Sequence, residues 1–198
     1  MTAEDLVRRL GELPTPNIGD AMDRLNVVDG AISSMWAGAR MAGRASTVYV
    51  AGGDNLGIHE ALDQISPGDV LVVNGQGATH RALIGELIAG RAALQGCAGF
   101  VLDAAVRDVS ELREMGFPVF ARSTTPAGPY RNGPYRLGES VAIGSVVVRP
   151  GDVVVGDDDG VVVVPWEDAP AVAGAAEAKR DTEARQRAEI EGRSTPVQ

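Results

Sequence analysis

The chain has 198 residues, of which 44% are hydrophobic and 23% are charged, as expected for one globular domain with a substantial core. No apolar run approaches the ~20 residues of a membrane span, and the N-terminus lacks a basic region followed by an apolar stretch. We therefore expect a cytoplasmic protein that contacts no membrane, and the net charge of -9 argues against nucleic-acid binding, which depends on Lys and Arg.

Up to residue 121, apolar periodicity predicts helices and strands that alternate. The first helix should carry Leu6, Val7 and Leu10 on one face, and Asn17 is expected to cap the second. The expected helices span residues 2–12, 17–25, 54–65, 80–94 and 108–115, and the expected strands span residues 44–50, 69–74, 100–103 and 118–121. Gly75-Gln76-Gly77 is predicted to be a loop that ends a strand. This order favours βαβ units around a partly parallel sheet.

The C-terminal part of the chain changes character. Residues 138–165 hold short valine-rich strands separated by turns at 150–152 and 156–160. Asp157-Asp158-Asp159 resembles a calcium loop only superficially, so we interpret it as one of these turns. A long helix is expected over residues 167–192, followed by a frayed tail at 193–198. We predict that residues 1–198 form a single α/β domain with a β-rich C-terminal half and a C-terminal helix.

Three potentially reactive side chains are interpreted conservatively. Cys97 is the single cysteine, which excludes an internal disulfide and a cysteine-rich zinc site. It lies in an apolar segment and is expected to be buried filler. His59 and His80 are isolated and lack metal-ligand spacing, so we expect them at the surface or in a pocket wall.

The most informative stretch is residues 101–111. Gly99 to Leu102 predicts a buried strand, which should end in a turn of small residues before Arg107, Asp108 and Glu111 at a helix start. Arg107 can grip a carboxylate or a developing oxyanion, and Asp108 is a hard oxygen ligand for a divalent metal. Glu111, three residues later, should share a helix face with Asp108. The alternative is an acidic helix N-terminus that favours the macrodipole, beside an exposed arginine.

A second stretch, Gly85-Glu86-Leu87-Ile88, opens or interrupts a helix where backbone N–H groups could receive an anion. The alternative is a helix that simply turns Leu87 and Ile88 to the core. Glu86 precedes Arg107 by 21 positions, which allows both to return to the sheet edge where α/β proteins bind ligands. Because the average field is negative, a pocket for an anionic substrate must be locally positive.

These motifs resemble those of the RraA-like family. That family contains class II 4-hydroxy-4-methyl-2-oxoglutarate/4-carboxy-4-hydroxy-2-oxoadipate aldolases and regulators of ribonuclease activity A, and many members carry the label demethylmenaquinone methyltransferase. The similarity runs from Thr15-Pro16-Asn17-Ile18-Gly19-Asp20-Ala21 to residues 157–165. Two departures stand out: Glu86 replaces a common aspartate, and Ala104 replaces a common glycine.

The resemblance implies a swivelling β/β/α fold in trimers or hexamers with sites between subunits. It also implies that Gly85, Glu86, Leu87 and Ile88 form the loop for the substrate carboxylate. Arg107 is similar to the family's substrate arginine, and Asp108 to its metal aspartate. Glu111 matches the acidic residue of aldolase-type members, where it would act on the metal through water.

We therefore expect a lyase dependent on Mg²⁺ or Mn²⁺ that cleaves 2-oxo acids of the 4-hydroxy-4-methyl-2-oxoglutarate type to pyruvate through an enolate, with oxaloacetate decarboxylation as a side activity. Arg107 would contact the keto oxygen, the amides of residues 86–88 would hold the carboxylate, and Glu86 would orient a water. Two rival functions remain. A regulator that binds a ribonuclease would need no metal, and a methyltransferase, ranked last, would need a nucleotide loop that is not apparent.

Overall fold

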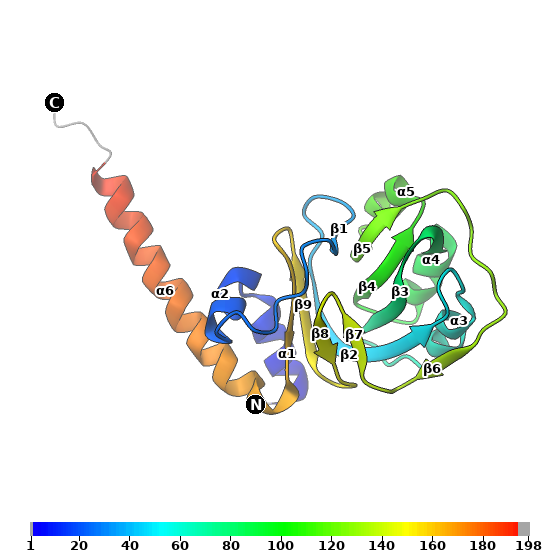
Figure 1. The fold of residues 1–198 in the computed structure, drawn as a ribbon. Coiled ribbons are helices and arrows are strands. Elements are labelled where there is room, and N and C mark those ends of the chain that lie inside the picture. The colour runs from blue at the N-terminus through cyan, green and yellow to red at the C-terminus, as the bar shows by residue number, and fades with distance from the viewer. Residues whose placement is uncertain (1, 194–198) are drawn as a thin grey trace.

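The computed structural model describes residues 2–193, and its centre is a mixed sheet of eight strands (Figure 1). The strands are β1 (Ser33–Ser34), β2 (Met41–Val50), β3 (Asp69–Ile84), β4 (Gly99–Val106), β5 (Val119–Thr124), β6 (Tyr135–Leu137), β9 (Val153–Asp157) and β10 (Gly160–Val164). Their order is β1-β5-β4-β3-β2-β9-β10, with β6 also paired to β2. Strands β2 to β5 are parallel, so their carboxyl ends meet at one edge.

The sheet lies between a helical layer and a small β layer. Helices α3 (Leu56–Leu62), α4 (Glu86–Leu94) and α5 (Val109–Glu114) cover one face, and the hairpin of β7 (Val141–Ile143) and β8 (Val146–Val148) covers the other. Strand β3 shows the alternation that builds two cores, because Leu71 and Val73 pack in the helical cluster whereas Val70 and Val72 pack with the hairpin. This order of layers confirms the expected β/β/α architecture.

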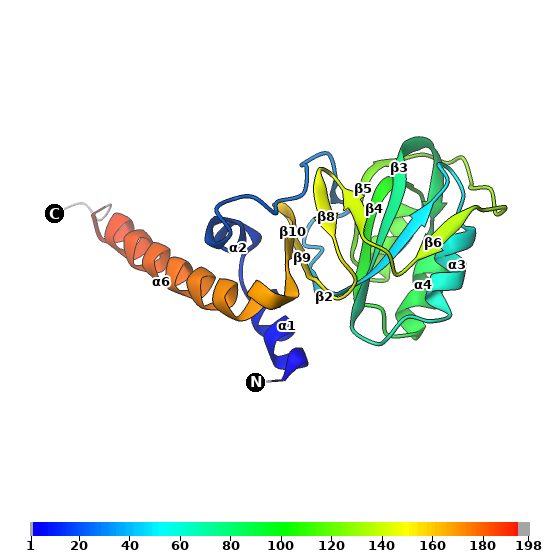
Figure 2. The same ribbon diagram turned by 60° about the horizontal axis from the view of Figure 1, so that its bottom comes forward.

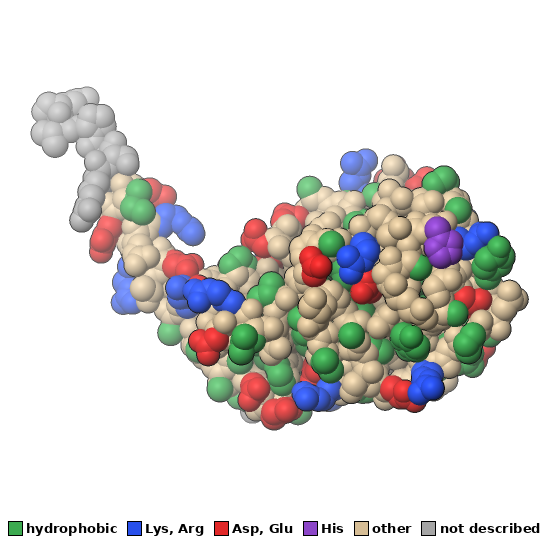
Figure 3. Space-filling view, in the orientation of Figure 1, with side chains coloured by type: hydrophobic (Ala, Val, Ile, Leu, Met, Phe, Trp, Pro, Cys, Tyr) green, Lys and Arg blue, Asp and Glu red, His purple; other side chains and the backbone are tan. Residues whose placement is uncertain are grey.

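A third cluster joins the termini to the far edge of the sheet. Helices α1 (Ala3–Gly11), α2 (Thr15–Ala21) and α6 (Ala169–Arg193) pack against β9 and β10, and a short 3-10 turn (Trp166–Asp168) precedes α6. Leu6 and Leu10 are buried there, with Val7 packed beside them, as the periodicity predicted. Beyond this contact α6 projects away from the body (Figures 1 and 2), and Figure 3 shows acidic and basic side chains interspersed along it.

The middle of the chain differs from the sequence prediction. Residues 75–77 are a bulge inside β3, with left-handed backbone at Gln76 and Gly77, and the strand continues to Ile84. The helix expected from residue 80 therefore begins at Glu86. Pairing of Ala82 and Ile84 with β4 overrides the helix propensity of this segment. Strand β4 also runs to Val106, so the expected turn of small residues at 104–106 is strand instead.

Helix α2 also differs, because Asn17 lies inside it and donates to Glu183 Oε2 at 2.8 Å. The helix begins two residues earlier, where the Asp157 carboxylate accepts from the Thr15 N–H at 2.9 Å and replaces a local cap. It ends at Ala21 because Asp23 and Arg24 adopt left-handed backbone.

The predicted C-terminal turn and long helix are confirmed where the structure describes them. Asp158 and Asp159 form the turn between β9, which ends at Asp157, and β10, and α6 follows as one long helix. Of the tail predicted over residues 193–198, Arg193 is instead the last residue of α6, and residues 194–198 lie outside the described residues. Cys97 is buried, and burial raises the pKa of its thiol. No helix within residues 2–193 is long and apolar enough to cross a membrane.

Candidate active site

The Arg107–Asp108 turn stands at the carboxyl end of β4, where ligands bind in open α/β sheets. The Arg107 N–H donates to the Ile84 carbonyl at 3.1 Å, which ties the turn to the end of β3. Asp108 then adopts left-handed backbone, with φ 59° and ψ 42°, and precedes α5 as its N-cap. Such a conformation costs a non-glycine residue about 1–3 kcal/mol and is concentrated at functional sites.

The Asp108 carboxylate lies over the first turn of α4. Its Oδ2 accepts from the Glu86 N–H at 3.1 Å and lies 3.4 Å from Arg107 Nε. A Cβ at position 85 would stand 2.1 Å from the same oxygen, so only glycine fits there. The structure therefore brings together the two stretches that the sequence singled out.

One amide of the expected anion site already has an acceptor. The N–H of Glu86 donates to the Asp108 carboxylate. Leu87 and Ile88 occupy the next positions of the first helical turn, where N–H groups have no intrahelical acceptor. The first-turn amides that remain as candidates for binding an anion are those of residues 87 and 88.

Arg107 borders a cavity of about 210 Å³, which we call the Arg107 cavity. Its lining residues are Asn55, His59, Leu83, Ile84, Gly85, Leu87, Ile88, Arg107 and Pro129. This volume suits a small organic acid, since pockets for drug-sized ligands start near ~300 Å³. Gly128 brings the loop before Pro129 close to Arg107, because a Cβ there would lie 3.1 Å from Arg107 Nη1.

Two polar residues of this cavity were not singled out as substrate contacts from the sequence. Asn55 is buried, and its Nδ2 donates to the Leu83 carbonyl at 3.1 Å. Its Oδ1 is buried without a hydrogen-bond partner among the residues described, a state that costs about 1–3 kcal/mol. His59 lies four positions later, in the pocket wall as expected. This spacing of four, across the start of a predicted helix, is the sequence signal that could have found the pair.

The surroundings of His59 favour its neutral imidazole. Its Nδ1 lies 3.3 Å from Nη1 of Arg91, and Arg91 in turn pairs with Asp63. Burial lowers the pKa of His59, and the positive charges of Arg131 and Arg91 lower it further.

Two predicted acidic residues lie away from this cavity. The Glu86 side chain lines a different hollow on the exposed side of α4, with Leu87, Leu94 and Met115. Glu111 is exposed on α5. Asp108 stands before that helix as its N-cap, with left-handed backbone, so it is not itself a helical residue of α5.

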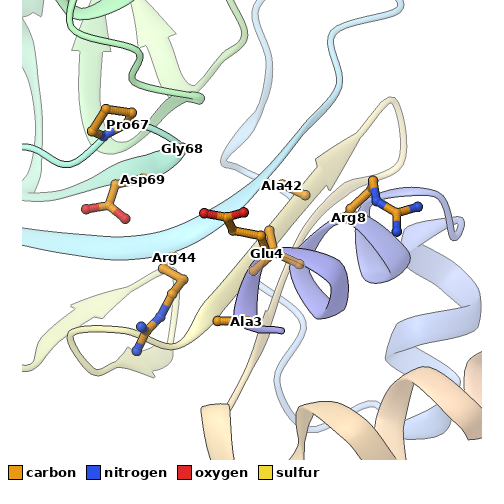
Figure 4. Close-up of a pocket in the computed structure, with 9 residues that line it drawn as sticks. Ala3, Glu4, Arg8, Ala42, Arg44, Pro67, Gly68 and Asp69 are labelled. Atoms are coloured by element: carbon orange, nitrogen blue, oxygen red, sulfur yellow. The ribbon is translucent and has the colours of Figure 1, made fainter. Parts of the chain in front are cut away.

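A hollow at the amino end of β3 makes a useful contrast (Figure 4). Its volume is about 310 Å³, larger than the Arg107 cavity, and its charged lining mixes Glu4 and Asp69 with Arg8 and Arg44. Arg44 donates to the Gly151 carbonyl and stacks over the Trp166 ring. Arg8 pairs with the carboxylates of Asp5 and Glu12. Its cations are thus engaged by structural partners, whereas the ion-pair partner of Arg107 is Asp108, the other residue of the candidate site.

The donor set at Asp108 fits a hard divalent cation. Within residues 2–193 no group of three His, Cys, Asp or Glu side chains gathers to enclose a metal. Mg²⁺ nevertheless binds through one or two carboxylates and completes its shell with water and substrate oxygens. Asp108 offers one partly exposed carboxylate, seated in the cradle that Gly85 leaves open.

The chain is similar to known proteins in sequence and in fold. The chain is 39% identical over 185 residues to a protein of Halalkalibacterium halodurans named "Putative 4-hydroxy-4-methyl-2-oxoglutarate aldolase", covering 93% of this chain and 88% of that protein. An uncharacterised protein from Pseudomonas syringae has the same fold, with a TM-score of 0.89 at 27% identity over 98% of this chain and 92% of the other.

Streptomyces coelicolor RraAS2, described as an unusual member of the RNase ES inhibitor RraA protein family, matches with a TM-score of 0.84 at 29% identity, over 92% of this chain and 96% of that one. The family model described as RraA-like, Aldolase/RraA, matches residues 15–163, which include every site residue discussed above. The chain therefore belongs to the RraA-like family.

Proposed function

We propose that this protein is a divalent-metal-dependent lyase that cleaves 4-hydroxy-4-methyl-2-oxoglutarate-type 2-oxo acids to pyruvate, with oxaloacetate decarboxylation as a side activity. The observation that carries the proposal is the meeting of Arg107, Asp108 and the first turn of α4 at one end of a small cavity. The name of the Halalkalibacterium halodurans relative supports the same chemistry.

In the proposed reaction, each charged group of the substrate has a partner in this chain. The first-turn amides of Leu87 and Ile88 would hold the substrate carboxylate. Arg107 would face the keto oxygen, where negative charge builds as the C3–C4 bond breaks and its electrons move toward the carbonyl. The 4-hydroxyl loses its proton and becomes the carbonyl of the second product, and a proton returned to C3 yields pyruvate. Mg²⁺ or Mn²⁺ at Asp108 would supply Lewis acidity to the substrate oxygens.

The direct test is pyruvate release from 4-hydroxy-4-methyl-2-oxoglutarate and from oxaloacetate, with Mg²⁺, with Mn²⁺ and with EDTA. We expect release from both substrates with either metal and loss of release in EDTA. Full activity in EDTA would contradict the metal role, and no release under any condition would contradict the lyase.

A ribonuclease regulator is the second candidate, favoured by the likeness to RraAS2. Oxalate separates the two functions because it mimics the planar, doubly charged pyruvate enolate. A lyase should bind oxalate more tightly than pyruvate, only with Mg²⁺ or Mn²⁺ present, and Arg107→Ala should weaken that binding in calorimetry. A regulator should instead inhibit its ribonuclease equally well with EDTA and with Asp108→Ala.

We also propose that the chain assembles as a trimer or hexamer with sites between subunits. The outer face of α4 exposes 78% of Leu87, which also lines the Arg107 cavity, and 91% of Leu94, and both line one hollow with Met115. Contiguous apolar surface of this kind marks interaction sites. Light scattering at micromolar concentration should give a mass near a multiple of three chains. An active monomer would contradict the assembly.

A further inference from the structure

The Arg107 cavity has a polar wall that the proposed anchoring of the pyruvate portion does not use. Asn55 immediately precedes α3 and His59 lies four residues later, so one segment presents both side chains to the cavity. Neither is needed to hold the carboxylate at Leu87 and Ile88 or the keto oxygen at Arg107. Asn55 and His59 are therefore available to contact the part of the substrate beyond its carboxylate and keto groups.

Asn55 supplies an acceptor. The Leu83 carbonyl can only accept a hydrogen bond, so the amide group that faces it must be Nδ2, and this fixes the orientation of the side chain. The remaining atom, Oδ1, is buried and has no donor within the part of the chain that the structure describes. A ligand that donates a hydrogen bond would satisfy it.

His59 supplies a donor. A guanidinium only donates hydrogen bonds, so Arg91 Nη1 at 3.3 Å requires Nδ1 of His59 to be the acceptor. The proton of the neutral ring then resides on Nε2. Asp63 holds Arg91 in place through an ion pair, so the tautomer is fixed by a chain of two contacts.

One acceptor and one donor at the same wall match a hydroxyl group, which both donates and accepts. A carboxylate at this position would have no proton to offer Asn55 Oδ1, and an apolar group would leave that oxygen unpaired. We propose that Asn55 and His59 recognise the 4-hydroxyl of a 4-hydroxy-2-oxo acid and are specificity-determining residues for aldol substrates over oxaloacetate, which has no such hydroxyl. This inference rests on the proposed lyase function.

The test compares two substrates on one preparation of each variant. His59→Leu should lower the ratio of kcat/KM for 4-hydroxy-4-methyl-2-oxoglutarate to that for oxaloacetate by about tenfold, the usual effect of one lost neutral hydrogen bond. His59→Gln, which keeps an amide donor, should recover part of the ratio. His80→Leu is the matched control, since His80 is exposed and does not line the cavity, and it should leave the ratio unchanged. An unchanged ratio in His59→Leu, or a parallel fall of both activities, would overturn the inference.

A second measurement does not depend on turnover. Calorimetry should show tighter binding of 4-hydroxy-4-methyl-2-oxoglutarate than of 4-methyl-2-oxoglutarate, which lacks only the hydroxyl, and Asn55→Leu should remove the difference. If the wild type releases no pyruvate but shows this preference, the lyase fails and hydroxyl recognition stands. Equal affinity for the two acids, or no binding of either, overturns the recognition itself.

Discussion

Two aspartates that follow valine-containing strands have opposite surroundings. Asp157 ends β9 and is buried, and its carboxylate accepts from the Thr15 N–H at 2.9 Å, the Thr15 hydroxyl at 2.6 Å and the Asp159 N–H at 3.0 Å. Asp108 follows β4 and is partly exposed; its carboxylate accepts one backbone N–H and has Arg107 beside it.

The difference shows what separates a structural carboxylate from one available to a ligand. An ionised carboxylate has about four acceptor positions, and three protein donors occupy most of them at Asp157. Asp108 keeps most of its positions open, in a strained turn beside a cation. The acidic run that looks more like a metal loop in the sequence is therefore the structural one.

The largest expected effect on activity comes from replacing each of the two aspartates separately with alanine. Asp108→Ala should reduce pyruvate release by about 10³-fold or more, because Lewis-acid stabilisation is worth several kcal/mol, while the fold survives. Asp157→Ala should instead lower the free energy of unfolding by about 1–3 kcal/mol through the orphaned Thr15 donors, and folded molecules should keep their kcat. Parallel turnover assays and urea titrations measure both. Equal turnover in Asp108→Ala would break the comparison.

Arg107→Lys tests whether Arg107 acts through the planar geometry of its guanidinium or only through its positive charge. Lysine cannot reproduce the planar guanidinium, so we expect a loss of at least ~10²-fold in kcat, the effect of removing one oxyanion donor. Arg113→Lys, on α5, is the matched control and should retain activity. Near-normal kinetics for Arg107→Lys would show that a diffuse positive charge is enough.

Gly85→Ala tests whether the position of the Asp108 carboxylate, which lies against Gly85, matters for activity. The new Cβ would lie 2.1 Å from Asp108 Oδ2, so the carboxylate must move. A displacement of this size should lower kcat by up to ~10²-fold. Gly90→Ala in the same helix is the control, since its Cβ would meet only the end of Met115 at 3.6 Å. If both variants kept wild-type kcat and the same response to Mg²⁺ concentration, the position of Asp108 would not matter.

Much of the fold and the main site motif followed from the sequence, because periodicity and turn residues act locally. The strands around residues 44–50 and 118–121 and the long C-terminal helix were predicted on that basis. The extension of β3 to Ile84 was not, since it depends on pairing with β4, a contact distant in sequence. The cap predicted at Asn17 fails for the same reason, because the carboxylate that accepts from the first turn of α2 belongs to Asp157, 142 positions away.

The site also combines features that residue type predicts with features that depend on contacts distant in sequence. Arg107, Asp108 and the loop at Gly85 were predicted, because each carries its chemistry in its residue type. The unpaired Oδ1 of Asn55 could not be, since the pairing of its Nδ2 depends on a carbonyl 28 residues away. The engagement of the Glu86 N–H likewise follows from the left-handed backbone of Asp108, which no local pattern indicates.

Asp54 extends the comparison between buried and exposed carboxylates. Its expected effect is smaller and concerns how the free energy of unfolding depends on pH. It is buried like Asp157, and its carboxylate accepts from the Asn132 N–H at 2.6 Å and the Leu56 N–H at 2.9 Å. Burial alone would raise the pKa of Asp54, but the backbone donors of Asn132, Leu56 and Gly133 outweigh burial and lower it. A carboxyl whose folded pKa lies below its unfolded value of about 3.9 contributes stability above that pH, and the contribution is lost as pH falls through the folded pKa.

Asp54→Asn should therefore unfold more easily than the wild type at pH 7, by about 1 kcal/mol. The gap should persist at pH 5 and shrink as the pH falls below about 4, because the carboxyl of the unfolded wild type then takes up a proton before that of the folded protein does. Urea midpoints of both proteins at pH 7, 5 and 3 measure the gap, and pyruvate release at pH 7 should stay close to wild type because Asp54 does not line the Arg107 cavity. A gap that stayed constant down to pH 3 would mean that the loss of stability does not depend on the charge of the Asp54 carboxylate. A carboxylate enclosed by backbone donors would then not differ from a neutral acceptor, and the contrast between Asp157 and Asp108 would have to rest on exposure alone.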